Sequence, residues 1–359
     1  MADNPQHRIS PGQLVVFLVS AQLGLGIFGL PRHAVERLGH AGWWLVLAAG
    51  LLAFPGVAII SALCGRFHAS ILSIHRRVFG AIIGTVLNLL FLSVLFGLTV
   101  ANFALFVQVL RIFFFKTTPV TVLTAFLIAP VTYIAAKGLK TVARFDSFVY
   151  IAIFALIGMM LAARREAEWT FVLPLFTFKT QAFLQTMFRL AFGFVGFDLL
   201  LVVHPWVRGR GAGRAALAAV GITTLVLTSF TVFTIAYFGE EYLIKQVFPL
   251  LNLVRSLPAP VIERLEIYFL MIWLPAMGSS AGAYFLATQL AAVEIFPRLP
   301  YRLLLAVLTV LTCLALLPLK KFDQVLILTN YAGAVGLFAV GILWPALVWL
   351  VAALRGLRG

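Results

Sequence analysis

Three closely spaced glycines and a proline interrupt the first long apolar segment of the chain. Gly24, Gly26 and Gly29 fall within six residues, and Pro31 follows them. Inside a bilayer, backbone N–H and C=O groups need protein partners, so an irregular backbone persists only where it is buried in protein or lines a cavity. Freed groups at such a break can bind the carboxylate and the ammonium of an amino-acid-like molecule. The pattern therefore predicts a broken helix at a binding cavity.

The same glycines have two other interpretations. Small residues let membrane helices pack closely, but three glycines followed by a proline exceed what packing needs, which favours the break. Residues 24–29 also match the letters G-x-G-x-x-G of a dinucleotide-binding loop. That loop requires a preceding β-strand and an acid about 20 residues later. The first apolar segment is a membrane span, and Trp43–Gly50 contains no acid, so a dinucleotide site is excluded.

A second interruption lies in the sixth apolar segment. Residues Phe192–Asp198 read FGFVGFD, so two glycines separate the aromatic residues and a carboxylate ends the run. Broken segments at corresponding places in the two halves of a polytopic chain indicate a transporter-type binding site. We therefore expect the two interruptions to face one another.

Asp198 is the only acid that the predicted spans place well inside the membrane. Burying a carboxylate there is costly, so such a residue is a functional candidate by default. Arg189 lies nine residues earlier, which does not give the i,i+4 spacing of a helical ion pair. Asp198 then either binds a ligand or a proton, or caps the half-helix that follows the break. The sequence leaves these two roles open.

A few uncharged polar residues also lie inside apolar segments. Asn102 and Gln108 occur in the third segment, and Gly278-Ser279-Ser280 lies in the middle of the eighth. Hydroxyl groups suit a coordinated cation, but they also bond to the backbone of their own helix, which is the favoured interpretation. Asn102 and Gln108 would line a cavity or join helices. The sequence shows no metal-ligand cluster, catalytic carboxylate pair or nucleophile motif, so we expect no cofactor and no enzymatic activity.

Membrane helices must position these residues. Hydrophobic residues make up 62% of the chain and charged residues 11%, against roughly 45–50% and about 25% in soluble domains. Long apolar runs therefore predict an all-α polytopic membrane protein, residues 1–359 forming a single transporter-like domain. Ten spans are predicted, at about Gln13–Leu30, Trp43–Cys64, Ile82–Leu110, Val120–Ala136, Phe148–Ala163, Phe183–Val203, Ala215–Phe238, Leu265–Ala291, Leu303–Leu319 and Leu326–Leu354.

Ten spans divide naturally into two sets of five. The two interrupted segments are then the first of each set, which is the arrangement that an inverted repeat produces. We therefore expect a first five-helix repeat at about residues 1–163 and a second at about 182–354, with helices 1 and 6 discontinuous.

The net charge of +15 is explained by the membrane and not by nucleic acid. Lysine and arginine occur in the short loops between apolar segments, where they anchor and orient helices. Their slight excess on one side predicts cytoplasmic N- and C-termini. The connection Gly239–Arg264 mixes charges with an apolar run, which predicts a short amphipathic helix.

These features, in order, resemble the spore permease family, the B subunits of bacterial spore germinant receptors, within the amino acid–polyamine–organocation transporter superfamily. The resemblance runs essentially end to end. It is carried by Ile9–Gln13 (ISPGQ), Gln22–Ile27 (QLGLGI), Phe188-Arg189, Gly196–Asp198 (GFD), His204-Pro205, Phe248-Pro249, Leu253–Arg255 (LVR), Glu263–Glu266 (ERLE) and Trp273.

The resemblance implies a ten-helix inverted-repeat fold around an amino-acid-type site at the membrane midplane. By position, the charged ends of the ligand would contact Gly24, Leu25, Gly26 and Ile27, and the opposing wall would be Phe194, Val195, Gly196 and Phe197. Asp198, Asn102 and Ser279 complete the candidate site. Proton-coupled relatives in the superfamily can carry a lysine in the fifth helix. Phe148–Ala163 has none, which favours a receptor.

The resemblance also implies a role. The chain would sense a nutrient, an amino acid by this account, at the inner membrane of a dormant spore, and would signal to an A subunit and a lipoprotein C subunit. The main alternative is an amino-acid permease that works by alternating access in the same pocket. A third possibility is a structural membrane subunit whose pocket is closed.

Overall fold

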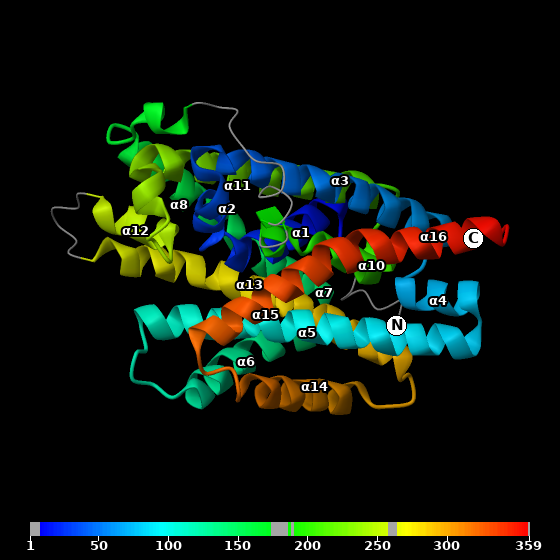
Figure 1. Cartoon of the computed structure of the whole chain (residues 1–359). Helices are drawn as coiled ribbons and strands as arrows, with labels where there is room; N and C mark the ends of the chain where they lie inside the picture. The colour runs from blue at the N-terminus through cyan, green and yellow to red at the C-terminus, as the bar shows by residue number, and fades with distance from the viewer. Residues whose placement is uncertain (1–7, 174–185, 188–189, 258–263, 358–359) are drawn as a thin grey trace.

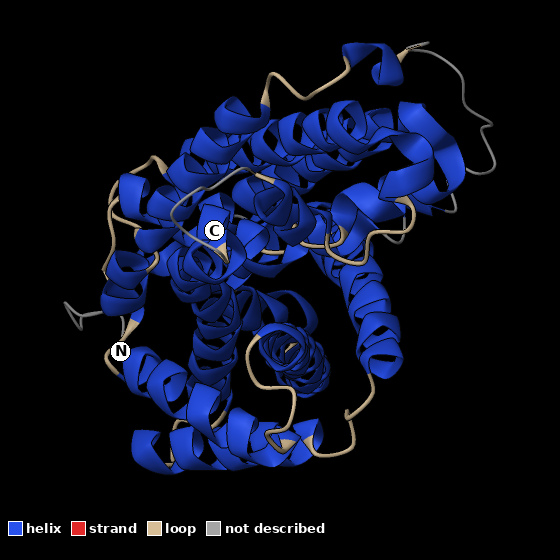
Figure 2. Cartoon of the chain, turned by 90° about the vertical axis from the view of Figure 1, so that its left-hand side faces the viewer, coloured by secondary structure: helices blue, strands red, loops and turns tan. Residues whose placement is uncertain are grey.

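The computed structural model describes residues 8–173, 186–187, 190–257 and 264–357. Across these ranges the chain is helical, and Figure 2 shows helices and loops without a sheet. One isolated bridge, between Ile9 and Val207, is the only strand-type pairing in the described residues. The prediction of an all-helical fold is therefore confirmed.

Fifteen α-helical pieces follow one another in the described residues (Figure 1). They are α1 (Pro11–Gly26), α2 (Leu30–Leu38), α3 (Gly42–Phe67), α4 (Ile71–Phe79), α5 (Ala81–Phe113), α6 (Val120–Ala136), α7 (Leu139–Phe145), α8 (Phe148–Ala163), α10 (Leu200–Val203), α11 (Ala212–Leu243), α12 (Pro249–Ser256), α13 (Leu265–Ile295), α14 (Tyr301–Leu316), α15 (Phe322–Ala334) and α16 (Trp344–Leu354). The 3₁₀ turns are η1 (Gly39–Ala41), η2 (Trp169–Val172), η3 (Ala191–Phe194), η4 (Phe197–Leu199) and η5 (His204–Trp206), and the π-helical η6 (Val335–Leu343) joins α15 to α16.

Six helical stretches of the described chain are long and apolar enough to cross a bilayer. They are Leu30–Phe67, Ala81–Phe113, Leu139–Ala163, Ala212–Leu243, Leu265–Ile295 and Phe322–Leu354. Four shorter apolar helices accompany them, at Pro11–Gly24, Val120–Ala136, Phe197–Trp206 and Tyr301–Leu316. Their outer surfaces carry large exposed apolar side chains, such as Ile82 and Phe154, which lipid would cover. The chain is a multi-pass membrane protein.

The core of the molecule surrounds α1 and α13. Helix α1 packs against α11 and α13, and it lies near the centre of Figure 1. Helix α13 is the most buried of the six long stretches, with 72% of its most apolar part inside the protein against 28% for α5. Residues of these two helices are therefore placed to line any site at the centre.

The start of α1 is fixed by its own sequence and by the end of the second interrupted segment. Ser10 caps the helix by accepting a hydrogen bond from the backbone N–H of Gln13, and the Gln13 side chain accepts one from the N–H of Ser10. Just before this cap, the N–H of Ile9 donates to the carbonyl of Trp206 over 3.0 Å. The two interrupted segments are thus tied together at this end.

A short helix occupies the connection after α11, as the sequence predicts. Helix α12 packs on α11 and α13 and buries Leu250, Leu251, Leu253 and Val254. Arg255 on its other face is exposed. The predicted short amphipathic helix is confirmed.

Candidate ligand-binding site

The first apolar segment is interrupted where the glycines predict a break. Helix α1 ends at Gly26, a turn follows, and α2 starts at Leu30 with Pro31 in its first turn. Proline suits this position because its missing N–H would have no helical partner there. The interruption therefore occupies the second half of the glycine-rich stretch, and Gly24 and Gly26 remain helical.

Gly24 and Gly26 are required for close packing. Neither has a positive φ. A Cβ at Gly24 would collide with the carbonyl oxygen of Ala276 on α13, and one at Gly26 would lie 2.6 Å from the Cα of Gly193 in η3. The two alternatives raised by the sequence are therefore both realised, with packing at Gly24 and Gly26 and the break directly after them.

Side chains of α13 bind the carbonyl groups near the end of α1. The last four carbonyls of a helix, here including that of Gly24, lack partners within it, so other groups must satisfy them. The indole N–H of Trp273 donates to the Gly24 carbonyl over 2.9 Å, and the Ser280 hydroxyl donates to the Ala21 carbonyl over 2.8 Å. Helix α13 thus stabilises the interrupted end of α1.

The second predicted interruption is also present. Turn η3 gives way to an extended residue at Val195, and Gly196 has a φ of 141°, a conformation that favours glycine. Turn η4 and the short α10 follow. A continuous α-helix is therefore absent between residues 190 and 199 of the described chain, as Phe192–Asp198 predicts.

Gln22 connects the two interrupted segments. Its amide nitrogen donates to the carbonyl of Phe194 over 3.1 Å, and its amide oxygen accepts from the hydroxyl of Thr223 on α11 over 2.6 Å. Its side chain is buried, and a Cβ at Gly196 would lie 2.8 Å from its Cγ. One uncharged side chain thus fixes α1, η3 and α11 relative to one another.

Asp198 stabilises the second interruption through hydrogen bonds. Its Oδ1 accepts hydrogen bonds of 2.8 Å from the backbone N–H of Gly196 and from the hydroxyl of Tyr284 on α13. These bonds support a structural role for Asp198. The carboxylate accepts from the N–H of Gly196, two residues earlier, whereas a usual N-cap accepts from an N–H two or three residues later. Its Oδ2 has no hydrogen-bond partner among the described residues. Arg189, considered as its partner, lies outside the described residues.

A small set of side chains from four elements meets between the interruptions. We call it the closed centre, and it consists of Ala21, Gln22, Gly26, Asn102, Phe192, Val195, Ser280 and Tyr284. The hydroxyl of Ser280 also donates to Oδ1 of Asn102 over 2.9 Å. No space large enough for a water molecule remains within this set. Of the predicted site residues, Gly26, Val195 and Asn102 belong to it.

The other predicted site residues lie around or away from the closed centre. Ile27 and Phe194 are buried beside it, whereas the Phe197 ring packs against Gly56 of α3 and Gly341 of η6. Ser279 lines a different cavity, with Asp146. Leu25 is part of α1 by its backbone, and its side chain lies outside the described part of the structure.

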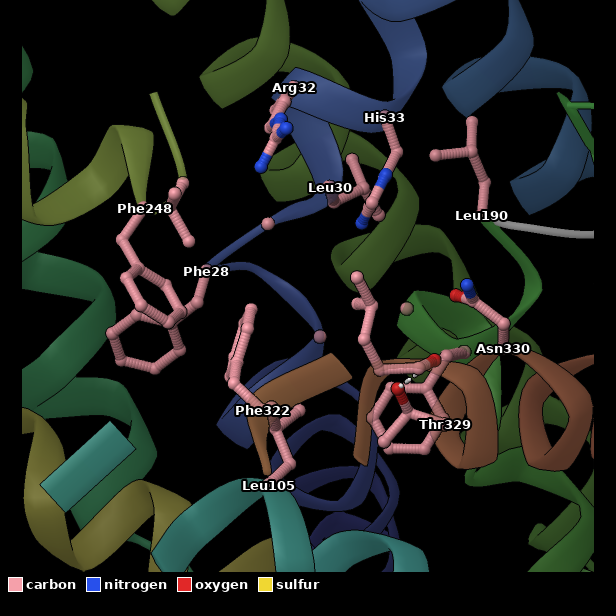
Figure 3. Close-up of a pocket in the computed structure, with 16 residues that line it drawn as sticks. Phe28, Leu30, Arg32, His33, Leu105, Leu190, Phe248, Phe322, Thr329 and Asn330 are labelled. Atoms are coloured by element: carbon pink, nitrogen blue, oxygen red, sulfur yellow. Dashed lines mark hydrogen bonds between the residues drawn. The ribbon is translucent and has the colours of Figure 1, made fainter. Parts of the chain in front are cut away.

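A cavity of about 60 Å³ lies beside the break and is lined by Gly26 (Figure 3). We call it the outer cavity. Arg32 and His33 project into it from α2, and Thr329 and Asn330 come from α15 on its other side. The sequence did not single out any of these four residues.

Comparisons with known proteins identify the family of the chain. The sequence profile of a family described as "Spore germination protein" matches residues 8–324. Spore germination protein GerQB of Bacillus cereus is 24% identical over 269 residues, 75% of each chain. Spore germination protein YndE of Bacillus subtilis is 22% identical over 361 residues, 98% of each chain.

A solved structure has the same fold. Mhp1, a nucleobase-cation-symport-1 family transporter in a closed conformation with bromovinylhydantoin bound, matches 92% of this chain and 78% of its own, with a TM-score of 0.61 and 14% identity. The class of protein is therefore a helical membrane protein with a transporter fold. Because the family profile covers most of its length, the chain belongs to the spore germination protein family, the spore permeases.

Proposed function

We propose that this chain is the nutrient-binding membrane subunit of a spore germinant receptor. The ligand binds between α1 and the second interruption, where Gln22 joins the two. The observation that carries the proposal is the meeting of two interrupted helices around buried, uncharged polar side chains. In the closed state Ser280 bonds to Asn102, and Gln22 and Tyr284 bond to protein groups around the centre. Ligand binding would replace some of these bonds and open the centre toward the outer cavity.

The chemistry of the closed centre suits an amino acid. A zwitterion carries no net charge, and the polar side chains of Gln22, Asn102, Ser280 and Tyr284 are also uncharged. The break supplies the complementary partial charges, because the C-terminus of α1 attracts an ammonium and the N-terminus of α2 attracts a carboxylate. An amino acid therefore matches this environment better than an ion of net charge.

The proposed fold is ten membrane helices in two inverted sets of five, at about residues 1–163 and 182–354. The interrupted segments run in opposite directions, which supports the inversion. Ile9, before α1, pairs with Trp206 and Val207 after the second interruption, whereas Gly26 at the other end of α1 packs on Gly193. The six long apolar stretches and four shorter ones supply the helices.

Partners and location follow from the family. We propose that the chain works with germinant receptor A and C subunits in the inner membrane of the spore, with both termini cytoplasmic. Opening of the closed centre would move α13, since Ser280 and Tyr284 lie on it, and this motion would reach the partner subunits. No cofactor and no nucleic acid are part of this proposal.

An amino-acid permease is the second candidate, and the transporter fold of the chain favours it. Uptake separates the two. Purified protein in liposomes should bind a nutrient amino acid without accumulating it if the chain is a receptor. Time-dependent accumulation inside the liposomes would instead identify a permease.

A further inference from the structure

A buried acid lies apart from the closed centre. Asp146 sits between α7 and α8, and its side chain is 0% exposed. Neither of its carboxylate oxygens makes a hydrogen bond of ordinary geometry with a described residue, and neither does the hydroxyl of Ser279. Asp146 and Ser279 interact with one another only outside that geometry. A buried carboxylate without a hydrogen bond of ordinary geometry is costly, so a group that binds it is expected.

Asp146 and Ser279 line a cavity of about 210 Å³ between α6, α7 and α13. Its inner part is buried, whereas Phe126 and Pro130 on α6 are exposed at its mouth. None of its lining residues comes from α1, so this cavity is separate from the closed centre and the outer cavity.

The wall formed by α13 keeps the cavity open. A Cβ built at Gly278 meets only the ring of Phe106, at 3.7 Å, so this glycine leaves space that a larger side chain would fill. Pro275, one turn earlier, also lines the cavity, as does Pro130 on α6. Prolines within helices tend to bend them.

We propose that this cavity binds a small organic cation with a primary ammonium group and a compact apolar body. The ammonium would pair with Asp146, so that no net charge remains buried, and would donate a hydrogen bond to Ser279. The rings of Phe106, Phe126 and Phe145 also line the cavity, and aromatic faces attract cations. The volume exceeds the roughly 150 Å³ of an engineered cavity that takes up benzene.

Other occupants fit the lining less well. Calcium takes six to eight oxygen ligands, whereas the side chains here offer three, two from Asp146 and one from Ser279. An anion would be repelled by the negative charge of Asp146. A neutral apolar molecule would fill the walls but leave the carboxylate unpaired, at a cost in free energy.

Three matched probes test the proposal on the purified full-length chain. Benzylammonium, benzyl alcohol and benzoate have similar bodies and differ in charge, and binding is measured by thermal unfolding across probe concentrations. We expect benzylammonium to bind at least about tenfold more tightly than benzyl alcohol, and benzoate not to bind. Asp146→Asn should remove the preference for benzylammonium.

Two glycine substitutions complete the test. Gly278→Leu should fill the cavity and abolish benzylammonium binding, whereas Gly158→Leu should leave it unchanged, because the position of its Cβ is in open space. Equal binding of benzyl alcohol and benzylammonium, or no benzylammonium binding, would overturn the proposal. Binding that survives both Asp146→Asn and Gly278→Leu would place the cation elsewhere. None of these substitutions alters the closed centre, so the nutrient-binding proposal stands or fails separately.

Discussion

Gln22 and Phe194 join the two interrupted segments through a buried hydrogen bond of 3.1 Å, from the amide nitrogen of Gln22 to the backbone carbonyl of Phe194. The residues are 172 positions apart in the chain. A carbonyl that has lost its helical partner thus gains one from the other interrupted segment. The break in one segment is stabilised by the other, and a ligand that replaced this bond would loosen both.

Replacing Gln22 tests this coupling. Gln22→Met keeps the size of the side chain but leaves the Phe194 carbonyl and the Thr223 hydroxyl without their partner. We expect a loss of about 1–3 kcal/mol of unfolding free energy, the cost of buried groups left unpaired. Thermal unfolding of Gln22→Met and of Gln108→Met measures it. Gln108, near the end of α5, donates part-buried hydrogen bonds to the carbonyls of Leu319 and Lys320. Equal effects of the two changes would contradict the coupling.

Gly26 tests the close approach of α1 and η3. The Cβ of Gly26→Ala would lie 2.6 Å from the Cα of Gly193, so one backbone must shift, at a cost of about 1–3 kcal/mol. Gly97→Ala on α5 is the control, since its Cβ would enter open space and alanine favours a helix by about 0.5–1 kcal/mol. Unfolding temperatures should therefore move in opposite directions. A neutral Gly26→Ala would argue against the close contact.

Replacing Tyr284 tests whether its hydrogen bond to Asp198 stabilises the second interruption. Tyr284→Phe removes one of the two hydrogen bonds to Oδ1 of Asp198 and leaves a buried carboxylate with less support. We expect a loss of about 1–3 kcal/mol in unfolding free energy. Tyr331→Phe, at a position that is 71% exposed, should change it little. If the two substitutions behave alike in thermal unfolding, Asp198 does not depend on Tyr284.

His75, on α4 and outside the long apolar stretches, should make the folding stability depend on pH. Its Nε2 accepts from the indole N–H of Trp344 over 2.8 Å, so Nδ1, 2.7 Å from Oδ1 of Asn88, carries the proton. Burial lowers the pKa of His75 from 6.5 to about 4, while the hydrogen bond to Asn88 opposes the shift. Between these values the unfolded chain binds a proton that the folded chain does not, so stability falls as pH falls from about 6.5 to about 4.

At pH 5 the protonation of His75 should lower the unfolding free energy by about 2 kcal/mol relative to neutral pH. Thermal unfolding at pH 7.5 and pH 5 measures it, and His75→Leu is compared with the wild type because other acids titrate in both proteins. The wild type should lose more stability than His75→Leu over this range. Equal losses of stability in the two proteins would show that folding does not keep His75 uncharged.

Helix geometry explains why the sequence located the interruptions but not every side chain of the site. The glycines and Pro31 are local signals, and both interruptions occur where they indicate. Ser279 and Ser280 are adjacent in sequence, yet successive residues of an α-helix point about 100° apart. Ser280 therefore reaches Asn102, whereas Ser279 lines the cavity that contains Asp146. Which of two neighbours faces the centre depends on the rotation of α13, and that is set by packing.

The burial of Asp146 and the hydrogen-bond partners of Gln22 could not be predicted from a single sequence. Asp146 precedes the predicted fifth span and so resembles a loop residue, but α7 extends the helical stretch to Leu139–Ala163 and buries it. Asp146 is therefore a second buried acid, which the predicted spans placed outside the apolar segments. Gln22 was visible as a polar residue beside the glycines, but its partners Phe194 and Thr223 are distant in sequence.

The most direct test of nutrient binding is ligand-dependent thermal stabilisation of the purified chain, measured for each common amino acid. A ligand at a hundredfold excess over its dissociation constant stabilises the folded state by about 2.7 kcal/mol. We predict that at least one amino acid stabilises the wild type and the control Gln108→Ala, but not Asn102→Ala, which removes a polar group from the closed centre. If no amino acid stabilises the wild type, or if one stabilises all three proteins equally, the closed centre is not the nutrient site.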